Sequence, residues 1–115
     1  MREHGQIALL RFPHVDLSLG KARPVLLVAR LPGRFEDWLV CMLSTQLHQA
    51  LADFDELLDE NQPDFNGSGV KVASVIRVAR LAVAPADMLI GTTGRVSAER
   101  LARIKKTLST WIASQ

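Results

Sequence analysis

Cysteine, aromatic side chains and long apolar runs are scarce in this sequence, and each shortage excludes a class of protein. The single cysteine, Cys41, cannot form an internal disulfide, so the sequence predicts a reducing, cytoplasmic environment. Because no stretch of about 18 uncharged apolar residues occurs, no membrane-spanning helix is expected. The N-terminal stretch is amphipathic from the start and lacks the apolar segment of a secretory signal. These features favour a cytoplasmic protein.

The sequence motifs of metal and nucleotide chemistry are also missing. His4, His14 and His48 do not have the spacing of a metal-ligand set. Cys41 stands alone in an apolar segment, where a buried, small hydrophobic side chain is expected. Neither a P-loop nor a GxGxxG motif is present. No metal ion or other cofactor is therefore expected.

The charged residues are unevenly distributed along the chain. Hydrophobic residues make up 48% of the sequence, which argues against disorder, and 115 residues predict one domain, over residues 1–115. Six of the 12 acidic residues lie between Asp53 and Asp64, so the rest of the chain is basic. A basic body is compatible with nucleic-acid binding. The acidic segment is either a solvated loop or a flap that repels RNA from a nearby site.

Short apolar runs bounded by turn residues predict five or six strands. The expected strands cover residues 6–12, 23–29, 37–44, 70–83 and 88–96. The segments 23–29 and 37–44 are apolar on both faces, so they should lie in the centre of a sheet. Residues 45–60 have two interpretations, a helix or a loop followed by a short strand near residues 55–59.

The last segment predicts an amphipathic helix that packs on the sheet. Ser97 is a candidate N-cap, and Glu99 lies in the first turn. One apolar stripe is expected from Leu101, Ile104, Leu108, Trp111 and Ile112, and a basic side from Arg100, Arg103, Lys105 and Lys106. Strands followed by one terminal helix exclude alternating β–α units. The predicted fold is mainly β, a small, strongly bent sheet or barrel.

Arg23 has a position that restricts its backbone. It precedes Pro24, which has no backbone N–H and so fits only at the start or the edge of a strand. A residue before proline is also held in an extended conformation. Arg23 should therefore lie where a loop becomes a strand, either as a functional cation with a defined direction or as a surface or ion-paired arginine.

Four segments of the chain occur in the order typical of one family. They are GQIALLRFPHVDLSLGKARPVLLVA at 5–29, VCMLSTQ at 40–46, GVKVASVIRVARL at 69–81 and IGTTGRVSAERLARIKKTL at 90–108. Together they resemble the MazF/PemK toxins, over nearly the whole chain. The resemblance implies an SH3-like barrel of five to seven strands with a C-terminal helix, acting as a homodimer. It also implies metal-independent cleavage of single-stranded RNA through the ribose 2′-hydroxyl, under the control of a cognate antitoxin protein.

The resemblance assigns roles to particular residues. Arg23 matches the family's catalytic arginine, and Ser44 takes the place of a catalytic threonine at the end of the third strand. Arg77 matches a further arginine, which is either a substrate-binding cation or half of an ion pair with an acid such as Asp16. Further candidates for substrate binding are Lys21, Thr45, Gln46 and His14. Since some family members place an aspartate where this chain has Ala79, that route to a general base is closed.

The sequence shows no clear general base, so both an enzyme and a binding protein that does not cut RNA are consistent with it. Arginine and serine are poor bases at neutral pH, and His14 is the candidate that titrates in a useful range. Ser44 could instead be a strand-end hydroxyl bonded to the backbone. The alternatives to an endoribonuclease are therefore a binding protein on the same fold, either a degenerate toxin or one that binds DNA gyrase, and an RNA-binding domain that does not cut.

Overall fold

The structure is a computed structural model that describes residues 2–11 and 21–115. The candidate His14 lies outside the described residues. The strands are β1 (Gln6–Leu10), β2 (Arg23–Arg30), β3 (Asp37–Ser44), β4 (Glu56–Leu58), β5 (Ser74–Pro85) and β6 (Leu89–Arg95). The α-helices are α1 (Phe65–Ser68) and α2 (Ala98–Ala113), and the 3-10 helices are η1 (Leu47–Gln49) and η2 (Ala86–Met88).

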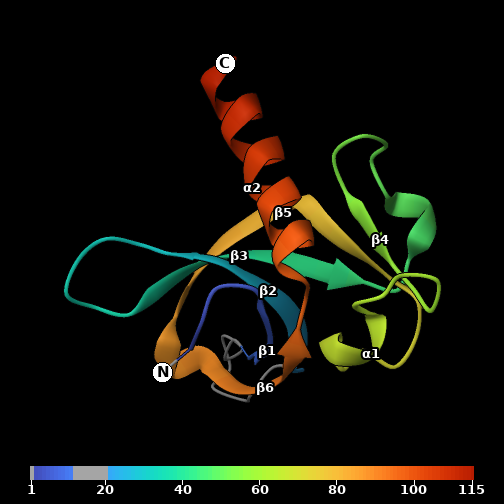
Figure 1. Ribbon diagram of the computed structural model, residues 1–115. Helices are drawn as coiled ribbons and strands as arrows, with labels where there is room; N and C mark the ends of the chain where they lie inside the picture. Colours follow the sequence, from blue (N-terminus) through green and yellow to red (C-terminus); the bar gives the residue numbers. More distant parts are fainter. Residues whose placement is uncertain (1, 12–20) are drawn as a thin grey trace.

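The six strands form one antiparallel sheet in the order β4-β5-β3-β2-β1-β6. The mainly β class with a C-terminal helix is confirmed, and β2 and β3 are central, as their apolar sequences predict. Figure 1 shows the sheet curling strongly, with α2 lying across it. In the part of the chain that is described, β4 and β6 are the two edges, so the sheet is open and matches a closed barrel only loosely.

Residues 45–60 follow the second of the two interpretations. After β3 the chain makes the short η1, and it reaches β4 only at Glu56. The helix interpretation is wrong for a physical reason. Asp55 Oδ2 accepts the backbone N–H of Leu51 at 2.9 Å, which stabilises a turn at the point where a helix would have to continue.

Two apolar clusters fill the faces of the sheet. Alternate residues of a strand point to opposite faces, so Leu26 and Cys41 belong to one cluster while Leu27 and Val40 belong to the other. The first cluster packs against α2 through Ile104, which is fully buried. The second cluster contains Trp38, which is 1% exposed and so lies in the core.

The C-terminal helix begins as predicted but is only partly covered. The Ser97 hydroxyl accepts the backbone N–H of Arg100 at 3.1 Å and caps α2. Leu101, Ile104 and Leu108 pack on the core, whereas Trp111 and Ile112 are 42% and 61% exposed because the last turns extend past the sheet (Figure 1). Within the described residues, no helix is long and apolar enough to cross a membrane.

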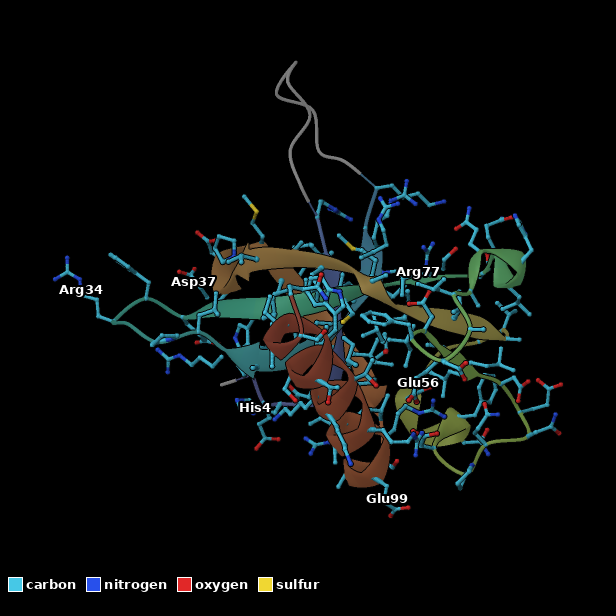
Figure 2. The ribbon with its side chains drawn as sticks, turned by 90° about the horizontal axis from the view of Figure 1, so that it is seen from above. His4, Arg34, Asp37, Glu56, Arg77 and Glu99 are labelled. Carbon is cyan, nitrogen blue, oxygen red and sulfur yellow. The ribbon has the colours of Figure 1, made fainter. Side chains whose placement is uncertain are left out.

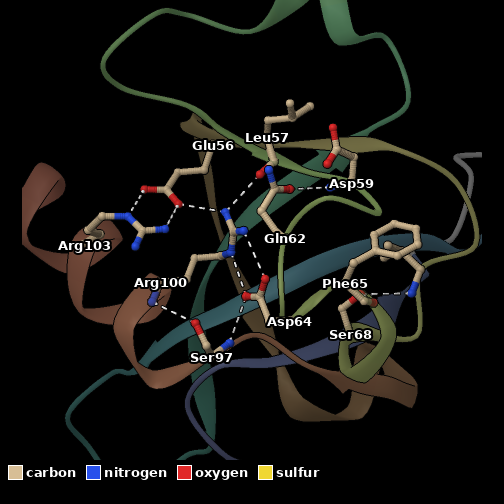
Figure 3. Close-up of polar contacts among 11 residues, drawn as sticks. Glu56, Leu57, Asp59, Gln62, Asp64, Phe65, Ser68, Ser97, Arg100 and Arg103 are labelled. Carbon is tan, nitrogen blue, oxygen red and sulfur yellow. Dashed lines mark hydrogen bonds and ion pairs between the residues drawn. The ribbon is translucent and has the colours of Figure 1, made fainter.

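The acidic segment 53–64 is only in part a solvated loop. Arginines of α2 hold Glu56 and Asp64, whereas Asp53 and Glu60 are exposed. Arg100 is 4% exposed and donates two hydrogen bonds to Asp64, at 2.8 and 3.1 Å, and one to Glu56 at 2.9 Å (Figure 3). Arg103 also pairs with Glu56. The prediction that Arg100 lies on the basic side of the helix, away from the buried face, is therefore wrong. The Arg100 side chain turns inward and pairs with two largely buried carboxylates, those of Glu56 and Asp64, whose side chains are 15% and 8% exposed.

Gly94 in β6 lies where the loop around α1 meets the strand. A Cβ atom at Gly94 would lie 2.1 Å from the carbonyl oxygen of Gly67, which is far inside van der Waals contact. We expect Gly94→Ala to lower the free energy of unfolding by about 1–3 kcal/mol, measured by urea denaturation. Gly91 is the matched control in the same strand, since no atom lies within 4 Å of its added Cβ. Equal stabilities of Gly94→Ala and Gly91→Ala would contradict this packing.

Candidate functional site

The ends of three strands bring together the arginines and the serine that the sequence singles out. Since β2 and β5 both run antiparallel to β3, the beginnings of β2 and β5 lie beside the end of β3. Arg23 is the first residue of β2, Ser44 is the last residue of β3, and Arg77 is the fourth residue of β5. Figure 2 shows Arg77 at the opposite end of the sheet from Arg34 and Asp37.

The strand register places Arg23, Ser44 and Arg77 on one face. Val25 pairs with Met42, so the same register continued to the strand ends sets Arg23 opposite Ser44. Opposite residues in an antiparallel pair have Cβ atoms about 5 Å apart. Arg77 pairs with Met42, which puts it on the same face and one row further along the strands. The three side chains therefore border one small region of the sheet.

Arg23 is exposed at this strand end. Pro24 follows it, and Arg23 pairs with Leu10 of β1, which fixes its backbone on that side. Among the residues that the structure describes, no ion pair engages Arg23. A guanidinium with this setting can bind two phosphate oxygens at once.

Ser44 is half-buried, and its hydroxyl bonds to the backbone. Ser44 Oγ accepts the N–H of Gln46 at 3.0 Å and so stabilises the turn that leaves β3. The sequence interpretation of a strand-end hydroxyl is thus observed. The hydroxyl proton is not used by this contact, because the oxygen acts as the acceptor, so Ser44 can still donate to a ligand.

Arg77 is held by an acid, and that acid is Asp55. Its Nε donates to Asp55 Oδ2 at 2.9 Å and its Nη1 donates to Gln49 Oε1 at 3.2 Å. The Arg77 side chain is 16% exposed, whereas the Asp55 side chain is completely buried. Arg77 is thus half of an ion pair, and its partner in the described residues is Asp55. The suggested partner Asp16 lies outside the described residues.

The remaining substrate-binding candidates lie around the same strand ends. Lys21 is exposed two residues before β2, and Thr45 and Gln46 are exposed directly after β3. Cys41, by contrast, is fully buried inside β3. Its burial, with a smaller contribution from the charge of Asp55, raises the pKa of the Cys41 thiol to about 12. Cys41 is therefore a core residue and no nucleophile.

Sequence reasoning missed Asp55 and Gln49, which hold Arg77. Asp55 is one of six acids in segment 53–64, and no local pattern distinguishes it from the others. A signal that could have pointed to it is the β4–β5 pairing, in which Glu56 lies opposite Ile76 and Asp55 is the next residue toward Arg77. That pairing requires the fold.

Comparisons with known proteins agree with this fold and order of motifs. The family model of the PemK-like, MazF-like toxins of type II toxin–antitoxin systems matches residues 3–112. Among solved structures, the Mycobacterium tuberculosis toxin MazF-mt6 is similar, with a TM-score of 0.66 and 20% sequence identity, covering 91% of this chain and 93% of that one. At this identity the likeness concerns the fold. No curated protein sequence matches the chain.

The matched family defines the chain as the toxin component of a toxin–antitoxin system. The protein belongs to the PemK-like, MazF-like toxins, because the family model covers almost all of its residues.

Proposed function

We propose that this toxin is an endoribonuclease that cuts single-stranded RNA at selected sequences without a metal ion. The observation that carries the proposal is the exposed Arg23 at the start of β2, which the β2–β3 register continued to the strand ends sets opposite Ser44, with Arg77 one row away. The wider proposal includes a single domain over residues 1–115, a homodimer, a cognate antitoxin as partner, and a cytoplasmic location. Family membership supports the antitoxin partner and the RNA substrate.

The proposed reaction is attack of a ribose 2′-hydroxyl on the adjacent phosphate. The 2′-hydroxyl loses its proton as the new P–O bond closes a 2′,3′-cyclic phosphate. The bond to the 5′-oxygen of the next nucleotide breaks, and that oxygen takes up a proton to leave as a 5′-hydroxyl. Negative charge grows on the non-bridging oxygens in the transition state, where a fixed guanidinium binds more strongly than it binds the ground state. Arg23 performs this task, and the hydroxyl proton of Ser44 donates to the phosphate or to the 2′-oxygen. Lys21, Thr45, Gln46 and Arg77 contact the neighbouring nucleotides, with His14 as the candidate base.

Base recognition in this proposal depends on hydrogen bonds more than on stacking. The sequence has two tryptophans and four phenylalanines, and Trp38 is in the core. The exposed Phe35 lies before the start of β3 and the exposed Trp111 lies in the last turns of α2, so neither is at the strand end that carries Ser44. Stacking platforms for single-stranded RNA need exposed aromatic faces. The polar side chains after β3, Thr45 and Gln46, are exposed and are therefore the proposed readers of the base edges.

The test is incubation of the purified protein with a long single-stranded RNA in EDTA. We expect discrete fragments with 2′,3′-cyclic phosphate and 5′-hydroxyl ends, formed at the same rate when Mg²⁺ replaces EDTA. An RNA with a 2′-deoxy nucleotide at the cut is the matched control and should stay intact, because the attacking oxygen is missing. Intact RNA from folded protein, over many RNA sequences, would favour the binding-protein alternative.

A further inference from the structure

The Asp55 carboxylate is the most fully engaged acidic group in the described part of the strand-end region. Its Oδ2 accepts the Arg77 Nε at 2.9 Å and the Leu51 N–H at 2.9 Å, and its Oδ1 accepts the Ala79 N–H at 3.1 Å. The side chain is completely buried. A buried carboxylate with three donors is well compensated for the loss of water, and its orientation is defined.

These contacts lie at an irregularity in β5. Cys41 pairs with Leu81 while the next residue, Met42, pairs with Arg77, so three residues of β5 are inserted between two neighbouring positions of β3. Such a bulge changes the direction of the strand and interrupts its backbone bonds. Ala79 lies in the middle of the insertion, and Asp55 accepts its N–H. Asp55 thus stabilises the bend directly beside Arg77.

The Asp55 carboxylate also fixes the position of the connection between β3 and β4, which follows Ser44. Leu51 and Gln49 belong to the connection between β3 and β4, and both meet the Asp55–Arg77 pair. The Arg77 guanidinium therefore has two of its three nitrogens held, Nε by Asp55 and Nη1 by Gln49. Because a guanidinium is planar, two fixed nitrogens determine the direction of the third.

We propose that Asp55 is a positioning residue of this toxin, which orients Arg77 and the connection after Ser44 toward the bound RNA. The inference rests on the proposed ribonuclease function. Asp55 does not itself touch RNA, because its side chain is buried. Arg77 and Asp55 together carry no net charge, so Arg77 contributes a directed hydrogen-bond donor more than a general attraction for phosphate.

The variant Asp55→Asn separates two possible roles of Asp55, its charge and its orientation of Arg77, because the two roles predict opposite effects. The variant loses a negative charge close to the RNA, so electrostatics alone predicts tighter binding and an undiminished rate. Loss of direction predicts a slower chemical step, since misplacement of a substrate-holding group by about 1 Å can reduce a rate about 100-fold. The rate of cleavage and the affinity for RNA must therefore be measured separately.

The experiment compares single-turnover cleavage by the parent, Asp55→Asn and Asp64→Asn at a temperature where circular dichroism shows each to be folded. We expect Asp55→Asn to be about 10- to 100-fold slower. Its Kd for the same RNA with a 2′-deoxy nucleotide at the cut should be equal to the parent's or lower. Asp64 is the matched control, a buried acid of the same segment that binds Arg100 on α2, and its variant should cleave within about twofold of the parent.

A double-mutant cycle with Arg77 completes the test. If Asp55 acts through Arg77, then Asp55→Asn causes no further loss of rate in an Arg77→Ala background. Equal rates for Asp55→Asn and Asp64→Asn, or an undiminished loss in the Arg77→Ala background, would overturn the inference alone. A parent protein that does not cut RNA overturns the proposed function, and the inference with it.

A second variant serves if Asp55→Asn does not fold. Gln49 is exposed and accepts the hydrogen bond from Nη1 of Arg77. Gln49→Ala therefore removes one of the two side-chain contacts that hold Arg77 and leaves no buried charge unpaired. We expect its single-turnover rate to fall about threefold, with the Kd for RNA unchanged. A rate equal to the parent's would overturn the inference.

Discussion

Arg23→Ala is expected to lower kcat/KM for RNA cleavage by about 100- to 1000-fold, which is the loss typical when one preorganised donor to a developing oxyanion is removed. The reason is the setting of Arg23 at the first position of β2, exposed and opposite Ser44. The measurement is the initial rate of cleavage of a labelled single-stranded RNA in EDTA. Arg23→Lys should retain part of the activity, because an ammonium keeps the charge but not the bidentate geometry.

Arg30→Ala is the matched control for this prediction. Arg30 is exposed at the other end of the same strand, so its loss lowers the net charge by the same amount. Both variants weaken the general attraction for RNA to a similar degree, and only Arg23→Ala should affect the chemical step. Activities of the two variants within about threefold of each other would show that Arg23 acts merely as one surface charge among others.

Arg100→Ala is expected to lower the free energy of unfolding by about 3–5 kcal/mol, which is typical when one partner of a buried ion pair is removed. Arg100 is 4% exposed and donates to two carboxylates, those of Glu56 and Asp64 (Figure 3). Its removal takes both guanidinium bonds from Asp64 and one bond from Glu56, which keeps its two bonds from Arg103. Urea denaturation at pH 7 measures the loss. A domain of this size has about 5–15 kcal/mol of stability in total, so the variant should be marginally folded.

Arg95→Ala is the control for Arg100→Ala. Arg95 pairs with Glu3, and both side chains are more than half exposed, so this ion pair should contribute at most about 1 kcal/mol. A difference of less than about 1 kcal/mol between the two variants would contradict the assignment of Arg100 as the anchor of the acidic segment.

The stability of the parent protein at low pH should depend on the ion pair between Arg100 and Asp64. The hydrogen bond from Arg100 lowers the pKa of Asp64 from 3.8 to about 2, against the opposing effect of burial. Because the pKa is lower in the folded state, the stability that Asp64 contributes is complete above about pH 4 and is lost as the pH falls toward about 2. In Arg100→Ala the pKa of Asp64 returns toward its ordinary value, so this part of the acid dependence should disappear.

The local sequence of this protein determined most of its secondary structure. Strand β3 runs from Asp37 to Ser44 as predicted, because an apolar run between polar residues specifies a buried strand without reference to the rest of the chain. The Ser97 cap of α2 was equally readable, since capping involves residues only three positions apart. The position of Arg23 at the start of a strand followed from Pro24 in the same way.

The partners of the charged side chains were decided by the tertiary structure alone. Asp55 lies 22 residues from Arg77, and Asp64 lies 36 residues from Arg100. No local pattern selects one acid of segment 53–64 over another, because each pairing depends on how β4 lies against β5 and α2. Sequence periodicity therefore predicted which residues form strands and a helix, whereas the packing of those elements determined that Arg100 is buried and that Asp55 holds Arg77. The physical reason is that periodicity reflects contacts within a few residues, while burial and ion pairing depend on neighbours that only the folded chain supplies.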